Sequence, residues 1–276
     1  MPTEPADLDG LPEPAHLHAC FSEHHRLDWG TPIQTTALIA AEYGPDATAK
    51  SLKLLCRLVD RHGDPTRQFL HSIRPGEVAH QLESRIKSPA SLARKIWKYG
   101  RKNRPALTDD VLRFTVLAEG PDTLVDSARG TVDRLNAAGW RVESAHQSYL
   151  DDSRYKGLHA IMRTDSGVQV EVQFHTSESI GVKTLTTGLY HTERDPRQTR
   201  EVRAAASREA IQLSAAMTKP SGIDALTDLG GVEVEPRRYG SGVRHSSPQP
   251  AQGPRTEPRQ GYSSRSRDLE SDGMTR

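Results

Sequence analysis

The sequence lacks the features of several protein classes. Its 276 residues include only two cysteines, Cys20 and Cys56, which supply neither a disulfide framework nor a metal-binding motif. No window approaches the roughly 18 apolar residues that a membrane span needs. The opening stretch, MPTEPADLDG, is acidic and contains proline, unlike a signal peptide. We therefore expect a cytoplasmic protein that does not contact a membrane.

Charge and apolar content are also low. The formal net charge is +1, which argues against a protein that coats nucleic acid or anionic membrane by bulk charge. Hydrophobic residues make up 34% of the chain and aromatic residues 5%, and the mean hydropathy is −0.67. Part of the chain therefore does not pack. We predict a loose arm over residues 1–33, one domain over 34–218, a short extension over 219–240 and a disordered Pro-, Ser- and Arg-rich tail over 241–276.

The periodicity of the central region predicts helices and strands in a particular order. Two helices fill residues 35–62, broken at YGPD, and a helix that starts at Ser88 and Pro89 runs to about Tyr99. A strand over 111–117, a helix over 122–140 and three strands over 141–150, 157–164 and 168–176 follow. Helices return after Ser177 and over 198–217. This order predicts an α+β protein with a small mixed sheet flanked by helices, and not a repeated βαβ array.

The stretch GVQVEVQFHT alternates strictly between apolar and polar residues. Its apolar set is Val168, Val170, Val172 and Phe174, and its polar set is Gln169, Glu171, Gln173 and His175. A period of two predicts a strand with one packed face and one face in water. The polar face is either the exposed side of a sheet or the floor of a site.

Cations gather around the start of the helix at Pro89. Ser91 and Lys95 lie four residues apart and share a helix face, and Arg85 and Lys87 come just before the N-terminus. Free backbone N–H groups and the helix dipole favour an anion there. A polyphosphate is the ligand that such a cluster would bind, and a solvated basic helix face is the alternative.

Acidic residues flank the predicted sheet. Asp109 and Asp110 precede the first strand, and Glu171 lies on another strand. Magnesium prefers a few carboxylates together with substrate phosphates, so these acids are candidate Mg²⁺ ligands. Strand parity places Asp109 on the face of Arg113, so the pattern alone leaves Asp109 and Asp110 as alternatives.

Four segments together resemble, in order and spacing, the synthetase domain of the RelA/SpoT family. They are RIKSPASLARK, DDVLRFTV, YKGLHA and VEVQFHT, which cover roughly residues 75–195. The residues of the last three segments look most similar to those of small stand-alone or toxin-like members. The resemblance implies a nucleotidyltransferase-like fold and Mg²⁺-dependent transfer of pyrophosphate from ATP to the 3′-hydroxyl of a nucleotide, with release of AMP.

The resemblance also implies roles for particular residues, and it favours Asp110 over Asp109. Asp110 and Glu171 are the implied catalytic residues and Mg²⁺ ligands, and Glu171 would also draw the proton from the acceptor hydroxyl. Tyr155 would stack on the acceptor base. The implied nucleotide-binding residues are Arg85, Lys87, Ser91, Lys95, Arg113, Tyr155, Lys156, His159, Gln173 and His175.

Several departures from the family leave the acceptor open. Asp151 and Asp152 stand where a lysine and an asparagine usually precede the stacking tyrosine, and Thr187 replaces a usual histidine. The acceptor is therefore GDP or GTP, ADP or ATP, or the 3′ end of a tRNA. No hydrolase domain is evident, so we expect a toxin or stress effector with an antitoxin partner. The alternatives are a non-catalytic nucleotide-binding module and an AMP-transferring nucleotidyltransferase, although the Gly-Ser motif that commonly precedes paired strand acids in the latter is not found before Asp109 and Asp110.

Overall fold

The computed structural model describes residues 8–105, 108–195 and 197–239, so the predicted tail at 241–276 and the first residues of the predicted arm lie outside the described residues. The helices are α1 (Pro14–Ser22), α2 (Thr36–Tyr43), α3 (Pro45–Val59), α4 (Gly63–Ser72), α5 (Pro89–Gly100), α6 (Leu124–Ala137), α7 (Ser177–Arg194) and α8 (Arg200–Ala215). The strands are β1 (Val78–Ala79), β2 (Arg113–Ala118), β3 (Arg141–Gln147), β4 (Leu158–Arg163), β5 (Gln169–Thr176), β6 (Asp228–Leu229) and β7 (Val232–Pro236). Among these residues, no helix combines the length and apolar character needed to cross a bilayer.

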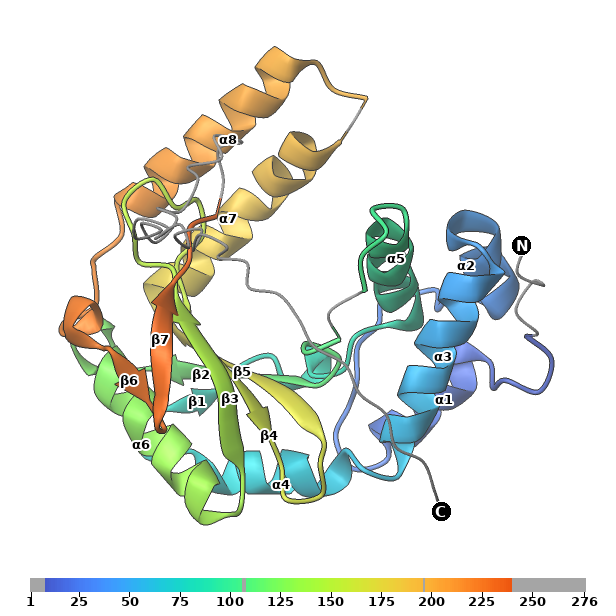
Figure 1. Cartoon of the computed structure of the whole chain (residues 1–276), viewed down its shortest axis with the longest axis horizontal. Coiled ribbons are helices and arrows are strands. Elements are labelled where there is room, and N and C mark those ends of the chain that lie inside the picture. Colours follow the sequence, from blue (N-terminus) through green and yellow to red (C-terminus); the bar gives the residue numbers. More distant parts are fainter. Residues whose placement is uncertain (1–7, 106–107, 196, 240–276) are drawn as a thin grey trace, which may run out of the picture. The chain divides into compact units, whose positions relative to one another are not determined.

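The strands form one mixed sheet in the order β1-β2-β5-β4-β3-β7-β6. The pairs β2–β5 and β3–β7 are parallel, and the other neighbours are antiparallel. The predicted α+β class and its small mixed sheet are confirmed (Figure 1). The segment 219–240, expected as a separate extension, contributes β6 and β7 to this sheet, with Val234 paired to Ala145.

One face of the sheet carries the main apolar core. Val170, Val172 and Phe174 of β5 are fully buried, and α6 packs on this part of the sheet. Phe114 of β2 stacks on Phe69 of α4, with 4.3 Å between ring centroids. Figure 1 shows α4 and α6 on this side of the sheet and the α7–α8 pair on the other.

The opposite face of β5 is not in water, so the prediction of a wet face is wrong. Glu171, Gln173 and His175 are only 9%, 5% and 0% exposed. They are covered by neighbouring polar and aromatic side chains such as Tyr155 and by α7, which begins where β5 ends. A period of two predicts which residues share a face of the strand. It does not predict that a helix later in the chain covers the polar face.

The predicted loose arm is also wrong for residues 14–33. Helix α1 places Leu17 and Phe21, four residues apart, in the main core, and Leu27 joins them at 3% exposure. The scattered prolines and histidines around this pair hide its helical spacing in the sequence.

The helices next to the predicted basic cluster form as expected. Gly44 adopts a φ of 84° and separates α2 from α3 at the YGPD turn. Helix α5 starts at Pro89, and the Ser88 hydroxyl accepts a hydrogen bond from the Ser91 N–H at 3.3 Å. Because α5 packs on α3 through Leu92 and Ala93, its basic face is turned away from the core.

Candidate active site

The first part of the site is a carboxylate held between two lysines. Asp110 Oδ2 accepts a hydrogen bond from Lys87, and its Oδ1 accepts one from Lys95 at 2.8 Å. Asp109 Oδ1 lies 3.4 Å from Lys95 Nζ, which is farther than the 2.8 Å from Lys95 to Asp110. The contacts therefore make Asp110, not Asp109, the centre of this cluster.

A short backbone pairing brings these residues together. The segment before α5 runs antiparallel to the start of β2, because Ile86 bridges Leu112 and the Lys87 N–H donates to Val111 O at 3.0 Å. Lys87 thereby meets Asp110, which precedes β2. Lys95 reaches the same carboxylate from the second turn of α5, while the Ser91 side chain is partly exposed one turn earlier.

The two lysines have opposite pKa shifts. Burial lowers the pKa of Lys87, and the nearby positive charges of Arg113 and Lys95 add to this effect, so that the Asp110 carboxylate offsets it only in part. Burial also acts on Lys95, but the carboxylates of Asp110 and Asp109 outweigh it and raise the pKa. Both ammonium groups are available to an incoming anion, with 24% and 19% of their side chains exposed.

Arg85 is not part of this cluster, so the prediction that it holds phosphate is wrong. The residue is 1% exposed. Its guanidinium donates to the backbone oxygens of Phe21, His25, Arg26 and Leu82, at 2.5 to 3.2 Å. Burial lowers the pKa of Arg85 to about 10. Arg85 therefore fixes the turn after α1 onto the domain, although its neighbour two residues later points into the site.

The second part of the site is Glu171 on β5. Its register partner on the parallel strand β2 is Arg113, and the Glu171 N–H donates to Leu112 O at 3.0 Å. Asp110 lies two residues before Leu112, which is at most about 7 Å of extended chain. The two residues therefore lie at the same end of two neighbouring strands.

The environment of Glu171 keeps it ionised. Burial by itself would raise its pKa, but the hydrogen bond to His159 and the charge of Arg113 outweigh burial and lower the pKa to about 2. Glu171 Oε1 lies 2.9 Å from His159 Nδ1. The Gln173 side chain also donates to the Glu171 carboxylate, while Gln173 Oε1 is buried and has no partner among the described residues.

A chain of hydrogen bonds runs from Glu171 into the protein. Tyr155 Oη lies 2.8 Å from His159 Nε2 and 3.0 Å from His175 Nε2, and His175 Nδ1 lies 2.9 Å from Ser179 Oγ. An ionised carboxylate only accepts, so His159 Nδ1–H donates to Glu171. The Tyr155 hydroxyl has one proton, so it can donate to only one of the two histidines.

This chain holds Tyr155 and both histidines in one arrangement. Burial places the pKa of Tyr155 well above its ordinary value and that of His175 well below. Both groups therefore stay neutral near neutral pH. Tyr155 as a residue is half-buried, and its stacking on an acceptor base stays a prediction.

Two further lysines behave differently from what the sequence suggested. Lys156 lies apart from the carboxylates, where it donates to Leu150 O near the exposed Asp151. Lys183 of α7 was not predicted, yet its charge acts on Glu171, Arg113 and His175. Burial and Arg113 lower the pKa of Lys183 to about 8. Lys183 lies seven residues, or about two helical turns, after the Thr176 cap, so it falls on the same face of α7 as the end of β5. That spacing was the sequence signal that could have identified it.

Comparisons with known proteins were made on sequence and on structure. No family model matches the sequence, and a search of curated proteins finds no match. A chain of the crystal structure of the Type VI effector Tas1 in complex with its immunity protein is 20% identical over 62% of this chain and 94% of that chain, with a TM-score of 0.33. A GTP pyrophosphokinase family protein from Streptococcus pneumoniae is 18% identical over 68% of this chain and 92% of its own, with a TM-score of 0.34.

Proposed function

We propose that the protein transfers pyrophosphate from ATP to the 3′-hydroxyl of a nucleotide and releases AMP. The observation that carries the proposal is the pair of carboxylates, Asp110 and Glu171, at the same end of β2 and β5, each surrounded by cations. A purely structural ion pair needs one cation per carboxylate. An excess of positive charge around two acids suits a polyphosphate and the reaction on it.

The cations would bind the triphosphate. Lys87 and Lys95 come from α5 and the segment before it, and Arg113 and Lys183 approach from β2 and α7. Four positive groups from three directions neutralise the charge of a triphosphate without a nucleophilic side chain. Phosphoryl-type transfer requires mainly positioning and charge neutralisation, so this set is sufficient for the class of reaction.

Glu171 would receive the proton of the acceptor. The 3′-oxygen forms a bond to the β-phosphorus, the bond from that phosphorus to the α–β bridging oxygen breaks, AMP leaves, and the hydroxyl proton passes to the Glu171 carboxylate. A pKa of about 2 keeps the carboxylate ionised but makes it a weak base. The hydrogen bond from His159 fixes its orientation, and Gln173 Oε1 is an unpaired buried acceptor that a substrate hydroxyl can satisfy.

The two carboxylates suit a Mg²⁺ ion that arrives bound to the phosphates of the substrate. The described residues contain no group of three or more potential metal ligands. Magnesium commonly takes one or two carboxylates together with phosphate oxygens and water, and Asp110 and Glu171 would supply the carboxylates. When bound, the ion would neutralise charge on the phosphates.

The acceptor remains a choice among guanine nucleotides, adenine nucleotides and a tRNA 3′ end. Asp151 and Asp152 are exposed in the turn before Tyr155, and Lys156 is engaged with a backbone oxygen of that turn. This local charge does not favour a 5′-diphosphate. A toxin or stress-effector role with an antitoxin partner, of the kind that Tas1 has in its immunity protein, belongs to the same proposal.

The experiment that tests the function follows the label of ATP. The protein is incubated with [γ-³²P]ATP, Mg²⁺ and, separately, GDP, GTP, ADP, ATP or tRNA. We expect label to move to one acceptor with AMP in equal amount. We expect the Glu171→Gln variant to lose transfer and keep its fold, and Glu209→Gln, an exposed change of the same kind on α8, to keep full activity. Label that stays in ATP with every acceptor would refute the enzyme and favour a non-catalytic nucleotide-binding module.

A further inference from the structure

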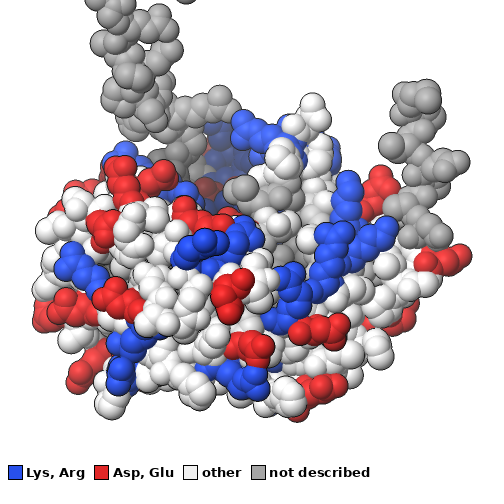
Figure 2. Space-filling view, turned by 60° about the horizontal axis from the view of Figure 1, so that its bottom comes forward, with Lys and Arg blue, Asp and Glu red and all other residues white. Residues whose placement is uncertain are grey.

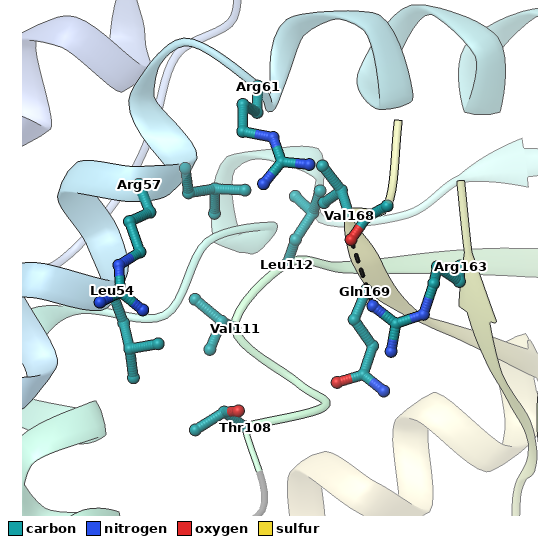
Figure 3. A pocket seen from close by; sticks show the side chains of 11 residues that line it. Leu54, Arg57, Arg61, Thr108, Val111, Leu112, Arg163, Val168 and Gln169 are labelled. Atoms are coloured by element: carbon teal, nitrogen blue, oxygen red, sulfur yellow. Dashed lines mark hydrogen bonds between the residues drawn. The ribbon is translucent and has the colours of Figure 1, made fainter. Parts of the chain in front are cut away.

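A pocket outside the two carboxylate clusters lies between the C-terminal part of α3 and the turn from β4 to β5. Its volume is about 330 Å³. Figure 3 shows Arg57 and Arg61 on one side, Arg163 on the other, and Val111 between them. The described residues that line it include no acidic side chain. An apolar floor with a guanidinium rim suits a ligand that has both a flat apolar part and a negative charge.

A second pocket of about 360 Å³ adjoins the first. The two pockets share Leu54, Arg57 and Thr108, and the second adds Lys50, Lys53 and Arg104. No acidic residue is among the described side chains that line this pocket either. We name the two pockets together the α3 groove. Six cations line the groove over a floor that contains Leu54, Leu58, Val111, Leu112, Val168 and Ile96.

The cations of α3 form a regular row. Lys50, Lys53 and Arg57 are exposed at i, i+3 and i+7, so they lie on one face of the helix. A rise of 1.5 Å per residue separates them by about 4.5 and 6 Å along the axis. Arg61 continues the row just past the helix end. Figure 2 shows Lys and Arg side chains gathered in a diagonal band on the right of one face of the molecule.

Two cations of the groove are held in place by the protein. Arg163 donates to Glu143 at 2.5 Å and to Gly167 O at 3.2 Å, and Arg61 donates to Ser166 O. These bonds fix each guanidinium at the rim. Arg57 forms no ion pair within the described part of the chain, so its charge is available to a ligand.

We propose that the α3 groove binds a single-stranded nucleic acid, with successive phosphates along the cations of α3 and bases against the apolar floor. A row of positive charges a few ångströms apart suits a ligand whose negative charges repeat along a chain. Every nucleotide carries a flat base beside its phosphate, which an acidic peptide need not do, and a membrane surface cannot enter a groove. This binding site is separate from the proposed phosphate-transfer residues and does not depend on that function. The net charge of +1 argues only against bulk coating of nucleic acid, and here the charge is local.

The test measures binding of a fluorescent 12-nucleotide single strand, as RNA and as DNA, by anisotropy across a range of salt concentrations, without ATP. Each phosphate contact on a single strand contributes about 0.7 to the slope of log K against log salt. The double variant Arg57→Gln, Arg61→Gln should reduce the magnitude of this slope by about 1.4. Between 1 M and 0.1 M salt its affinity should therefore rise by roughly 25-fold less than that of the parent protein. Arg200→Gln with Arg208→Gln, two exposed arginines on α8, is the matched control and should change neither.

The outcomes separate cleanly. Loss of affinity and slope in the α3 pair alone supports the proposal, and a preference for RNA or DNA identifies the natural strand. No binding at 50 mM salt, equal losses in both double variants, or equal competition by poly-glutamate would overturn it. Arg57→Gln alone, with half the expected change in slope, serves if the double variant does not fold. Because the readout is binding without ATP, failure of the proposed transfer activity does not affect the result.

Discussion

Replacing Arg85 by alanine distinguishes a structural role from a substrate-binding role. The four-segment resemblance implies that Arg85 contacts ATP, whereas the structure buries its guanidinium against four backbone oxygens, three of them between Phe21 and Arg26. The alanine variant leaves those oxygens without their donor and opens the space that the side chain filled. We therefore expect a large loss of stability and no specific loss of ATP binding.

The magnitude follows from the contacts. A hydrogen bond from a charged donor contributes about 1.5–3 kcal/mol, and removing one partner of a buried charged network costs about 3–5 kcal/mol. The bonds share one guanidinium and do not add, so we expect Arg85→Ala to lower the free energy of unfolding by about 4 kcal/mol. For a domain of this size, each kcal/mol shifts the Tm by about 2–4 °C, which gives a decrease of roughly 8–16 °C.

The assay combines thermal unfolding with steady-state kinetics. Arg94→Ala, an exposed arginine on α5, is the control and should change the free energy of unfolding by no more than about 0.5 kcal/mol. At a temperature where Arg85→Ala is folded, its KM for ATP should equal that of the parent. An unchanged Tm together with a tenfold higher KM would show that Arg85 binds the nucleotide and that the reasoning here is mistaken.

Four further predictions concern Lys183, Tyr155 and the helix cap Ser88. Loss of the Lys183 proton should lower kcat/KM as the pH rises through about 8, and Lys183→Arg should move that decline to higher pH; an unchanged profile would place Lys183 outside the reaction. Because folding lowers this pKa, the charged form opposes folding, and the free energy of unfolding should rise between about pH 8 and 10.5. Tyr155→Phe leaves two buried histidine nitrogens unpaired and should cost about 2 kcal/mol by urea denaturation, with kcat falling more than KM changes; an unchanged stability would show that the two hydroxyl contacts do not hold the site together. Ser88→Ala removes the cap of α5 and should cost about 1 kcal/mol in the same assay, whereas no loss would mean that the packing of α5 on α3 suffices.

Local patterns predicted the secondary structure well because they act within a few residues. Ser88 and Pro89 mark the start of α5, and alternation marks β5, since capping and pleating depend on neighbours in the chain. Helix α1 was missed because only Leu17 and Phe21 carry its apolar face among prolines and histidines. The two-residue strands β1 and β6 carry no periodic signal at all.

The sequence by itself determined which residues can supply the chemistry, because the types and spacing of Lys87, Lys95, Asp110 and Glu171 are local properties of the chain. Tertiary structure alone decided which charges meet. Parallel pairing of β2 with β5 sets Arg113 beside Glu171, and α7 brings Lys183 to the same carboxylate. Within residues 85–87 the side chain of Arg85 is buried in the protein, whereas that of Lys87, two residues later, bonds to Asp110 in the site. Contacts between distant segments depend on how the helices and strands pack, and the spacing of residues along the chain does not predict that packing.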